Sequence, residues 1–244
     1  VTFLGHVLSE NGLSVEADKV KAMIEWPRPQ NRKHILSFLG LCGYYRTFIE
    51  NFSQIALPMT ELLKESKEWN WNEQVEKSFR QLQQAMLNTP VLASPDPTRK
   101  FIVTTDASDF AIGAALSQQF DSGERPIAFY SKKLSSAEVN YAVHEKELLA
   151  VIQALKEWRC FLDGQHFTVL TDHKSLIYLQ SQPHLSNRQV RWLEFLSLFN
   201  FTIQYKPGKT NPVADALSRR HDHELLNSEV NSVSELGTSE LYKQ

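Results

Sequence analysis

The order of strand-like and helix-like segments after residue 98 constrains the fold of this chain most strongly. Three apolar runs come first, a long amphipathic segment follows, and a strand, helices, a last strand and a short helix complete the series. This mixed order indicates an α/β sheet with helices packed against it. The expected elements are strands 101–106, 111–118 and 125–132, helix 139–162, strand 166–172, helices 173–180 and 187–199, strand 201–206 and helix 211–220.

The first 88 residues or so have a mainly helical pattern after a short hairpin. Asn11-Gly12 is a strong turn signal between two strand-like runs. Asn31 is placed to cap a helix that contains Gly40 and Gly43, and we expect these glycines to allow close packing. The Pro-rich segment 88–100 then marks the best domain boundary. The expected helices are 15–26, 32–49, 53–65 and 72–87.

Four acidic residues lie where these elements end or turn. Asp106 closes the first strand after the boundary, Asp172 closes strand 166–172, and Asp215 lies at or near the start of the last helix. The long helix offers Glu147 or Glu145, which flank its apolar stripe on opposite sides, and periodicity does not choose between them. If the two strands are neighbours in one sheet, three or four carboxylates converge at one edge.

Converging carboxylates need positive charge, because two like charges about 4 Å apart repel by roughly 4 kcal/mol at an effective dielectric constant of 20. Carboxylate oxygens suit Mg²⁺ or Mn²⁺, and the sequence has no Cys/His cluster with zinc-like spacing. Two such ions form the clamp used in phosphoryl transfer by nucleases. Taken singly, however, each Asp is more often a cap or a turn residue.

Composition excludes several classes of protein. The two cysteines form no CxxC pair, and no apolar run approaches the roughly 18 residues of a membrane span, so we expect an intracellular chain that is not secreted. The absence of an initiator Met suggests a fragment of a longer protein. Net charge is −2, but residues 222–244 hold five acids and one lysine, which leaves +2 for the remainder. That excess is too small to prove nucleic-acid binding.

Four motifs in the second half resemble the ribonuclease H domain of gypsy-type (metavirus) LTR retrotransposon polyproteins: TTDAS, YAVHEKELLAVIQALKEWRCFL, LTDHKSL and KTNPVADALSR. Upstream, FLGHVLSENGLS, the segment from IEWPRPQ to LLK, and WNWNEQVEKSFRQLQQAML resemble the end of a reverse transcriptase palm, its thumb and a connector. The resemblance covers residues 1–220. It implies palm end and thumb in 1–64, a helical connector in 65–97, a ribonuclease H-like domain with a five-stranded mixed sheet in 98–220, and a flexible acidic tail in 221–244.

The resemblance also implies roles for the acids. Asp106 matches the first metal-binding acid, Glu147 rather than Glu145 matches the helix acid, and Asp172 and Asp215 match the third and fourth. In the family these acids hold two Mg²⁺, for which Mn²⁺ can substitute, and cut the RNA strand of RNA:DNA hybrids. The expected partners are therefore an RNA:DNA template-primer and the rest of the Pol polyprotein, with no membrane, in a cytoplasmic virus-like particle.

Hybrid binding requires basic and aromatic side chains along the phosphates. Our candidates in the thumb-like helix and in helix 187–199 are Arg32, Lys33, Arg46, Arg188, Arg191 and Trp192, each of which can equally be a solvated charge or a core residue. At the opening hairpin, FLGH resembles the primer-grip region, although Phe3 and Leu4 can also serve only in packing.

Two departures from related sequences bear on function. The loop before the fourth acid carries Tyr205 where retroviral relatives have a His, a residue that gypsy-type elements commonly lack. His173, beside Asp172, is a local candidate for proton transfer and equally a solvated residue.

The sequence contains no Asp-Asp dipeptide, so this chain alone is not expected to polymerise DNA. The alternatives to a nuclease are a catalytically silent template-primer binding module and, less favoured, an integrase or transposase.

Overall fold

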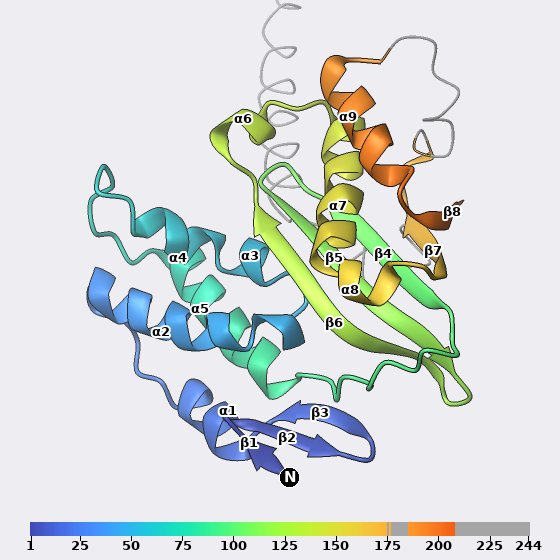
Figure 1. Cartoon of the computed structure of the whole chain (residues 1–244). Helices are drawn as coiled ribbons and strands as arrows, with labels where there is room; N and C mark the ends of the chain where they lie inside the picture. Colours follow the sequence, from blue (N-terminus) through green and yellow to red (C-terminus); the bar gives the residue numbers. More distant parts are fainter. Residues whose placement is uncertain (175, 177–184, 208–244) are drawn as a thin grey trace, which may run out of the picture. The chain divides into compact units, whose positions relative to one another are not determined.

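A five-stranded mixed sheet forms the centre of the second half of the chain (Figure 1). The computed structural model describes residues 1–174, 176 and 185–207. The strand order is β6-β5-β4-β7-β8, in which β4–β7 and β7–β8 are parallel and the other two pairs antiparallel. The five strands expected from the sequence are therefore confirmed. They are β4 (Phe101–Ala107), β5 (Ala111–Phe120), β6 (Gly123–Lys133), β7 (His166–Thr171) and β8 (Asn200–Tyr205).

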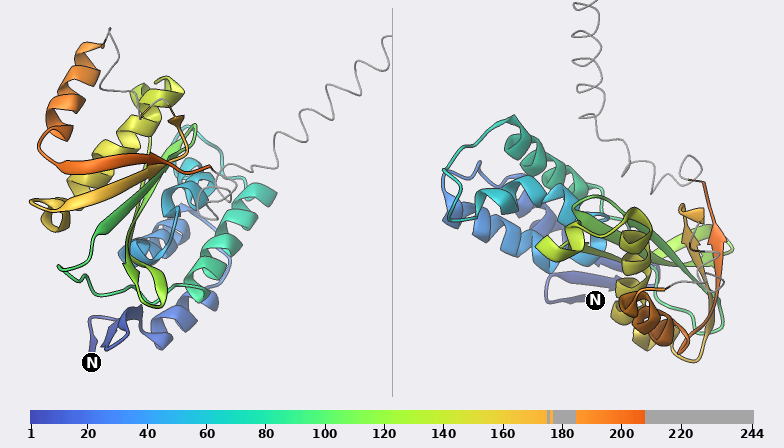
Figure 2. Two further views of the ribbon diagram at one scale, coloured as in Figure 1. Left: turned by 90° about the vertical axis from the view of Figure 1, so that its right-hand side faces the viewer. Right: turned by 90° about the horizontal axis from the view of Figure 1, so that it is seen from above.

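Helices α7 (Val143–Glu157) and α9 (Asn187–Leu196) cover the same face of this sheet (Figures 1 and 2). Side chains of β4 and β5 that face α7, such as Val103 and Leu116, are fully buried in one apolar core. Because successive side chains of a strand point to opposite faces, this core takes alternate residues of each strand.

The prediction of a single helix over 139–162 is wrong. The structure has three helices here: α6 (Ser136–Val139), α7 and α8 (Arg159–Leu162). Ala142 has an extended backbone with ψ of 153°, which interrupts the helix before α7 begins. A second interruption falls at Trp158, where φ is −102° and ψ is 21°. The buried indole of Trp158 packs in the same core as α7, so the amphipathic pattern continues across the break.

The first part of the chain is a small antiparallel sheet followed by helices, as the sequence predicts. Asn31 and Asn72 accept hydrogen bonds from the backbone N–H groups of His34 and Val75 and so cap the two longest helices of this part. The expected helix 53–65 is instead two short helices, with Pro58 in the first turn of the second. The elements are β1 (Thr2–Phe3), β2 (His6–Ser9), β3 (Gly12–Val15), α1 (Ala17–Ile24), α2 (Arg32–Tyr44), the 3₁₀ helix η1 (Arg46–Phe48), α3 (Phe52–Ile55), α4 (Leu57–Leu62) and α5 (Glu73–Leu87).

Glycines of the first part have different roles from those expected. A Cβ on Gly12, which has φ of +123°, would lie 2.0 Å from the carbonyl oxygen of Leu92, so the hairpin needs glycine where it pairs with the connector. For Gly40 and Gly43, by contrast, an added Cβ would meet no atom within 4 Å. The expectation that these two glycines permit close packing is wrong, because they lie on a part of α2 with open space beside it.

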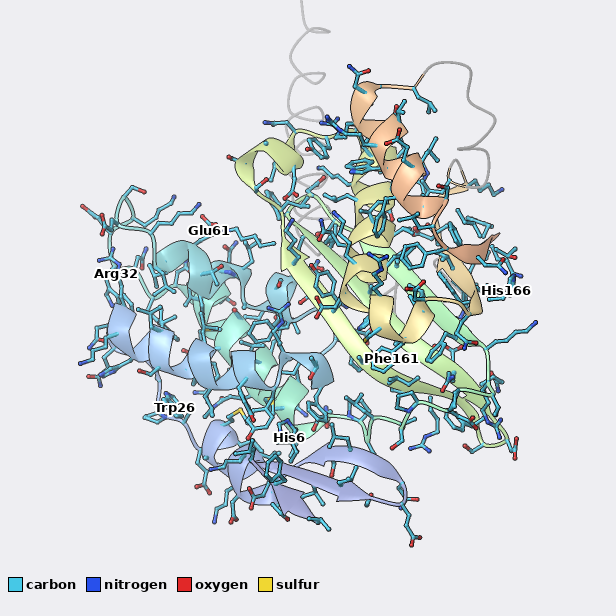
Figure 3. All side chains as sticks on the ribbon, in the orientation of Figure 1. His6, Trp26, Arg32, Glu61, Phe161 and His166 are labelled. Carbon is cyan, nitrogen blue, oxygen red and sulfur yellow. The ribbon has the colours of Figure 1, made fainter. Side chains whose placement is uncertain are left out.

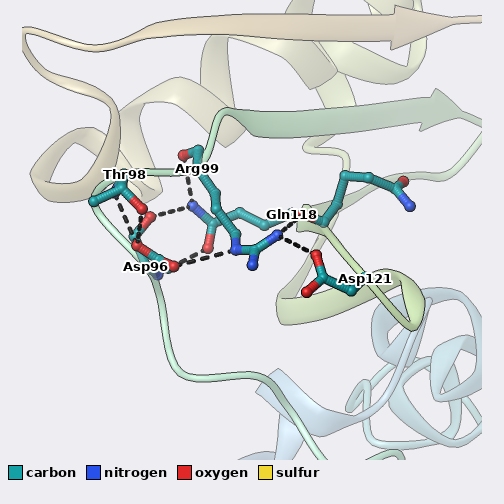
Figure 4. Close-up of polar contacts among 6 residues, drawn as sticks. Asp96, Thr98, Arg99, Gln118 and Asp121 are labelled. Carbon is teal, nitrogen blue, oxygen red and sulfur yellow. Dashed lines mark hydrogen bonds and ion pairs between the residues drawn. The ribbon is translucent and has the colours of Figure 1, made fainter.

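The Pro-rich connector is tied to the end of β5 by a polar cluster (Figure 4). The Gln118 side chain is fully buried; its amide donates to the carbonyl oxygens of Asp96 and Arg99, and its oxygen accepts from the Asp96 N–H. Arg99 in turn forms ion pairs with Asp96 and Asp121. A segment that composition alone marks as a boundary is thereby held in one conformation.

Two apolar cores meet at the Pro-rich segment. One contains residues from Val15 to Leu92, and the other begins at Ala93. The proposed thumb and connector segments share the first core, and their division at residue 64 remains a prediction. Val1–Pro207 forms one structural unit, and residues 208–244, with the expected helix 211–220 and acidic tail, lie outside the described residues, as does most of the expected helix 173–180. Within the part of the chain that is described, no helix has the length and apolar character needed to span a membrane.

Candidate metal centre

Asp106 and Asp172 lie at the carboxyl ends of two neighbouring parallel strands. Ile102 and Thr104 of β4 stand in register with Thr168 and Leu170 of β7, so both strands run to the same edge of the sheet. Asp106 is the penultimate residue of β4, and Asp172 directly follows Thr171, the last residue of β7. The parallel pairing, which the sequence could only suggest, is what brings the two carboxylates together.

Glu147 on α7 completes a cluster of three carboxylates. Side-chain oxygens of Asp106, Glu147 and Asp172 all lie within 4.8 Å of one another. Glu147 is 4% exposed, and its Oε2 is buried without a hydrogen-bond partner among the described residues. The structure therefore brings together three of the four acids singled out in the sequence. The fourth, Asp215, lies outside the described residues.

The two acids of α7 between which periodicity could not choose have different contacts in the structure. Glu145 accepts two hydrogen bonds of 2.8 Å from the Arg188 guanidinium and is not part of the cluster. Glu147, two residues further along, faces the two aspartates instead. Glu145 therefore joins α7 to α9, whereas Glu147 is free to bind a cation.

Burial and mutual repulsion make the cluster hold protons strongly. Burial, and then the charges of Asp106 and Asp172, raise the pKa of Glu147 to about 9. Burial, and then the charge of Asp172, raise the pKa of Asp106 to about 7. A hydrogen bond from the Ala107 backbone lowers the pKa of both groups but does not offset these effects. Without a cation, the folded protein thus disfavours the fully ionised cluster.

The donor set fits a hard divalent cation. All three side chains offer carboxylate oxygens, which is the ligand type preferred by Mg²⁺ and Mn²⁺. The unpaired Oε2 of Glu147 needs a partner, since a buried charged oxygen without one is costly. A cation between the three side chains would supply that partner and offset the repulsion that helps to raise the pKa values of Asp106 and Glu147.

Near Asp106 lies another carboxylate, that of Glu50, which sequence analysis did not identify. Burial, and then the charge of Asp106, raise the pKa of Glu50 to about 7. Glu50 belongs to the loop after η1, 56 residues before Asp106 in the chain. No motif or periodicity connects the two segments, so only the folded structure could reveal this neighbour.

The other residues near the predicted site are arranged as follows. The backbone N–H of Lys206 donates to the Thr171 carbonyl oxygen, which places the start of the loop after Tyr205 beside the end of β7. The backbone N–H of His173 donates to the Thr171 hydroxyl oxygen. His173 and Tyr205 are therefore close in the fold to the strand that carries Asp172, and their proposed roles stay predictions.

Of the six candidate nucleic-acid contacts, four are held by contacts within the protein and two are exposed. Arg32, which Figure 3 labels in the helical region, donates to the carbonyl oxygens of Leu62, the last residue of α4, and of Lys64 and Lys67 after it. Arg46 donates to the Ser131 carbonyl oxygen, and Trp192 packs against the core of the sheet. Arg188, as noted, is paired with Glu145. Lys33 and Arg191 are exposed and remain the candidates best placed to meet phosphates.

Replacement of Arg188 with Ala is expected to destabilise the fold by about 2 kcal/mol, because it leaves the Glu145 carboxylate, only 12% exposed, without its partner. The guanidinium also stacks on the Tyr141 ring, with 3.7 Å between its carbon and the ring centroid. Urea denaturation of the variant measures this loss. As a control, Arg191→Ala should change stability by less than about 0.5 kcal/mol. An Arg188→Ala protein of unchanged stability that binds hybrid less tightly would instead assign Arg188 to nucleic-acid binding.

Comparisons with known proteins agree with this geometry. Residues 96–199 match the family described as an RNase H-like domain found in reverse transcriptase. The Tf2-3 and Tf2-4 transposon polyproteins of Schizosaccharomyces pombe are each 40% identical to this chain over 225 residues. These matches cover 90% of this chain but 17% of each polyprotein, so the chain spans only a small part of the curated relatives.

Solved structures share the fold expected from the sequence. A foamy viral protease-reverse transcriptase in complex with double-stranded DNA has a TM-score of 0.70 and 25% identity, over 84% of this chain and 44% of that chain. The same kind of protein in complex with an RNA/DNA hybrid has a TM-score of 0.67 and 24% identity, over 84% of this chain and 29% of that chain. The expected ribonuclease H-like fold is thus confirmed.

Proposed function

Because residues 96–199 belong to the family of RNase H-like domains found in reverse transcriptases, and nearly the whole chain is similar to retrotransposon polyproteins, we propose that this chain is a ribonuclease H. Its reaction is metal-dependent hydrolysis of the RNA strand of RNA:DNA hybrids. The observation that carries the proposal is the convergence of Asp106, Glu147 and Asp172 from three separate elements of the sheet domain.

Two Mg²⁺, or Mn²⁺ in their place, fit this site. Asp106, Glu147 and Asp172 would hold these ions, and by family resemblance Asp215 of the C-terminal segment would be a fourth ligand. When bound, such ions activate water and stabilise the attacking and leaving oxygens of the phosphodiester. The protein's own contribution is to hold the carboxylates rigidly: Asp106 pairs with Gly113 of β5, and β4 also pairs with β7 over Ile102 to Thr104.

Substrate selection follows from what distinguishes RNA from DNA. The RNA strand presents 2′-hydroxyl groups that polar side chains beside the carboxylates can contact and that DNA lacks. Exposed basic side chains such as Lys33 and Arg191 would bind phosphates of the hybrid that lie outside the carboxylate cluster. Phosphate contacts of this kind give affinity, and the 2′-hydroxyl contacts give specificity for the strand that is cut.

Polymerase activity, in this proposal, belongs to other parts of a longer polyprotein. The chain spans 17% of its curated relatives and contains no Asp-Asp dipeptide. Its N-terminal helices would act as a thumb and connector that hold the template-primer. Location in a cytoplasmic virus-like particle is part of the same proposal.

Cleavage of labelled RNA:DNA hybrid in the presence of Mg²⁺ tests this function. The expected result is cutting of the RNA strand alone, with 3′-hydroxyl and 5′-phosphate ends, and none in the presence of EDTA. RNA:RNA and DNA:DNA duplexes of the same sequence serve as controls and should remain intact. Tight hybrid binding without any cutting would overturn the nuclease assignment and support a silent template-primer binding module.

A further inference from the structure

The loop that carries Glu50 lies against the sheet face on which Asp106 sits. Asp106, Gly113 and Ser131 are neighbours in register across β4, β5 and β6, and by strand alternation their side-chain positions share one face. Val103 and Ala107 pack in the core on the α7 side, so the positions of Gly113 and Ser131 lie on the opposite face of the strands. Asp106 stands at the end of β4, where its carboxylate also meets Glu147 of α7. Residues of the first part of the chain cover that row.

Three contacts fix the loop on this row. The Arg46 guanidinium donates to the Ser131 carbonyl oxygen at 3.3 Å, and the Ser53 N–H donates to the Ser131 hydroxyl at 2.9 Å. The Asn51 Oδ1 is 2.5 Å from the position that a Cβ on Gly113 would take, so the loop approaches the backbone next to Asp106. Glycine at position 113 is what permits this approach.

The flanking residues hold Glu50 itself in place. Phe48 and Ile49 are 1% and 2% exposed and anchor the loop in the first core. Asn51 has φ of +56°, a left-handed conformation that turns the chain between Ile49 and α3. Glu50 therefore cannot move away from the sheet without displacing buried neighbours.

The Glu50 carboxylate has no structural explanation within the described part of the chain. Its Oε1 is buried and has no hydrogen-bond partner there, and no ion pair involves it. The partly buried Glu76 of the same helical region, in contrast, accepts hydrogen bonds from Trp71 and Arg80. Acidic groups near one another do not by themselves define a site, but the unpaired Oε2 of the 4% exposed Glu147 independently points to a cation in this cluster.

We propose that Glu50 is a further carboxylate of the metal centre, contributed by the N-terminal helical region rather than by the ribonuclease H-like domain. This inference rests on the proposed function. Glu50 is a positioning residue: its carboxylate accepts hydrogen bonds from water bound to the cation held by Asp106. The helical region thereby completes the site, and the strength of metal binding depends on its docking against β5 and β6.

The first test is calorimetric titration of Mn²⁺ into the whole chain. Glu50→Gln should weaken Mn²⁺ binding by about tenfold, the lower end of the usual effect of losing an outer-shell partner. Glu65→Gln is the matched control, because it makes the same change at an exposed glutamate of the same region and should bind as the unsubstituted protein does. Equal affinity in the Glu50→Gln and Glu65→Gln variants would overturn the inference.

Thermal denaturation of the metal-free protein separates this role from a merely structural one. Removing a like charge beside Asp106 should leave the Tm of Glu50→Gln equal to or above that of the unsubstituted chain. A lower Tm together with weaker Mn²⁺ binding would overturn the inference in favour of a packing role. Failure of the proposed function looks different: Asp106→Asn would then leave Mn²⁺ binding and hybrid cleavage unchanged.

Discussion

Asp106→Asn is expected to reduce the rate of hybrid cleavage by at least about a thousandfold. The substitution keeps the size of the side chain but removes the charge at the centre of the carboxylate cluster. Metal ions contribute several kcal/mol to stabilising the transition state of such reactions, and each 1.36 kcal/mol is a factor of ten in rate. Single-turnover cleavage of labelled RNA:DNA hybrid in saturating Mg²⁺ measures the loss.

The fold should survive this substitution, because Asn removes repulsion instead of a favourable contact. Circular dichroism of the variant should match that of the unsubstituted chain. Asp121→Asn is a matched control: this aspartate has a side chain 96% exposed and lies in the turn between β5 and β6. Its rate should stay within about twofold. Undiminished cutting by the Asp106→Asn variant would contradict the assignment of the active site and the proposed mechanism.

Sequence analysis could predict the strands because each is a short run of apolar residues bounded by turn residues. It could also predict that Asp106 and Asp172 end two strands, since both are the first charged residue after an apolar run. Their proximity depends on which strands are neighbours and in which direction they run, and periodicity carries no such information. The choice of Glu147 over Glu145 likewise came from resemblance, and the pairing of Glu145 with Arg188 supports it.

The helix boundaries and Glu50 escaped prediction for a related reason. Breaks at Ala142 and Ala56 do not interrupt the apolar pattern, because the helices on both sides of each break pack against the same core. Glu50 looks like any surface glutamate in sequence. It becomes unusual only because Arg46 and Ser53 bind Ser131 and so bring the loop beside Asp106.

The proposed role of Glu50 gives the docking of the helical region a functional consequence. The ribonuclease H-like domain supplies three carboxylates from β4, α7 and the end of β7, and the helical region contacts the same sheet through η1, α3 and an ion pair from Glu61 of α4 to Lys133. A change that loosens this contact would act on the metal centre without touching its ligands. On the proposed function, the two parts of the chain form one catalytic unit, and the helical region is more than a spacer beside the nuclease domain.

The metal-free protein is expected to lose stability as pH rises from 5 to 8. The pKa of Asp106 is raised from 3.8 to about 7 and that of Glu147 from 4.5 to about 9, so between these limits the folded state binds more protons than the unfolded state. The stabilisation is fully present below about pH 4 and is lost as pH passes through the folded-state pKa values, which belong to the cluster as a coupled system.

The size of this effect can be bounded from Asp106 alone. From pH 5 to pH 8 the solution passes through about two units of the interval in which the pKa of Asp106 is raised, from 3.8 to about 7, which corresponds to about 3 kcal/mol at about 1.4 kcal/mol for each pH unit. For a chain of this length that difference lowers the Tm by about 10 °C. Circular dichroism melts in EDTA at pH 5 and pH 8 measure the change, and Asp106→Asn should show a clearly smaller decrease.

Added Mg²⁺ should recover most of the stability lost at pH 8 and have little effect at pH 5. A cation that binds only the folded state stabilises it by mass action, and it binds best when the carboxylates are ionised. At pH 5 protons already neutralise Glu147 and Asp106, so they compete with the metal. A Tm that does not depend on pH in EDTA, or an equal gain from Mg²⁺ in the Asp106→Asn variant, would show that the acid cluster is not the metal centre.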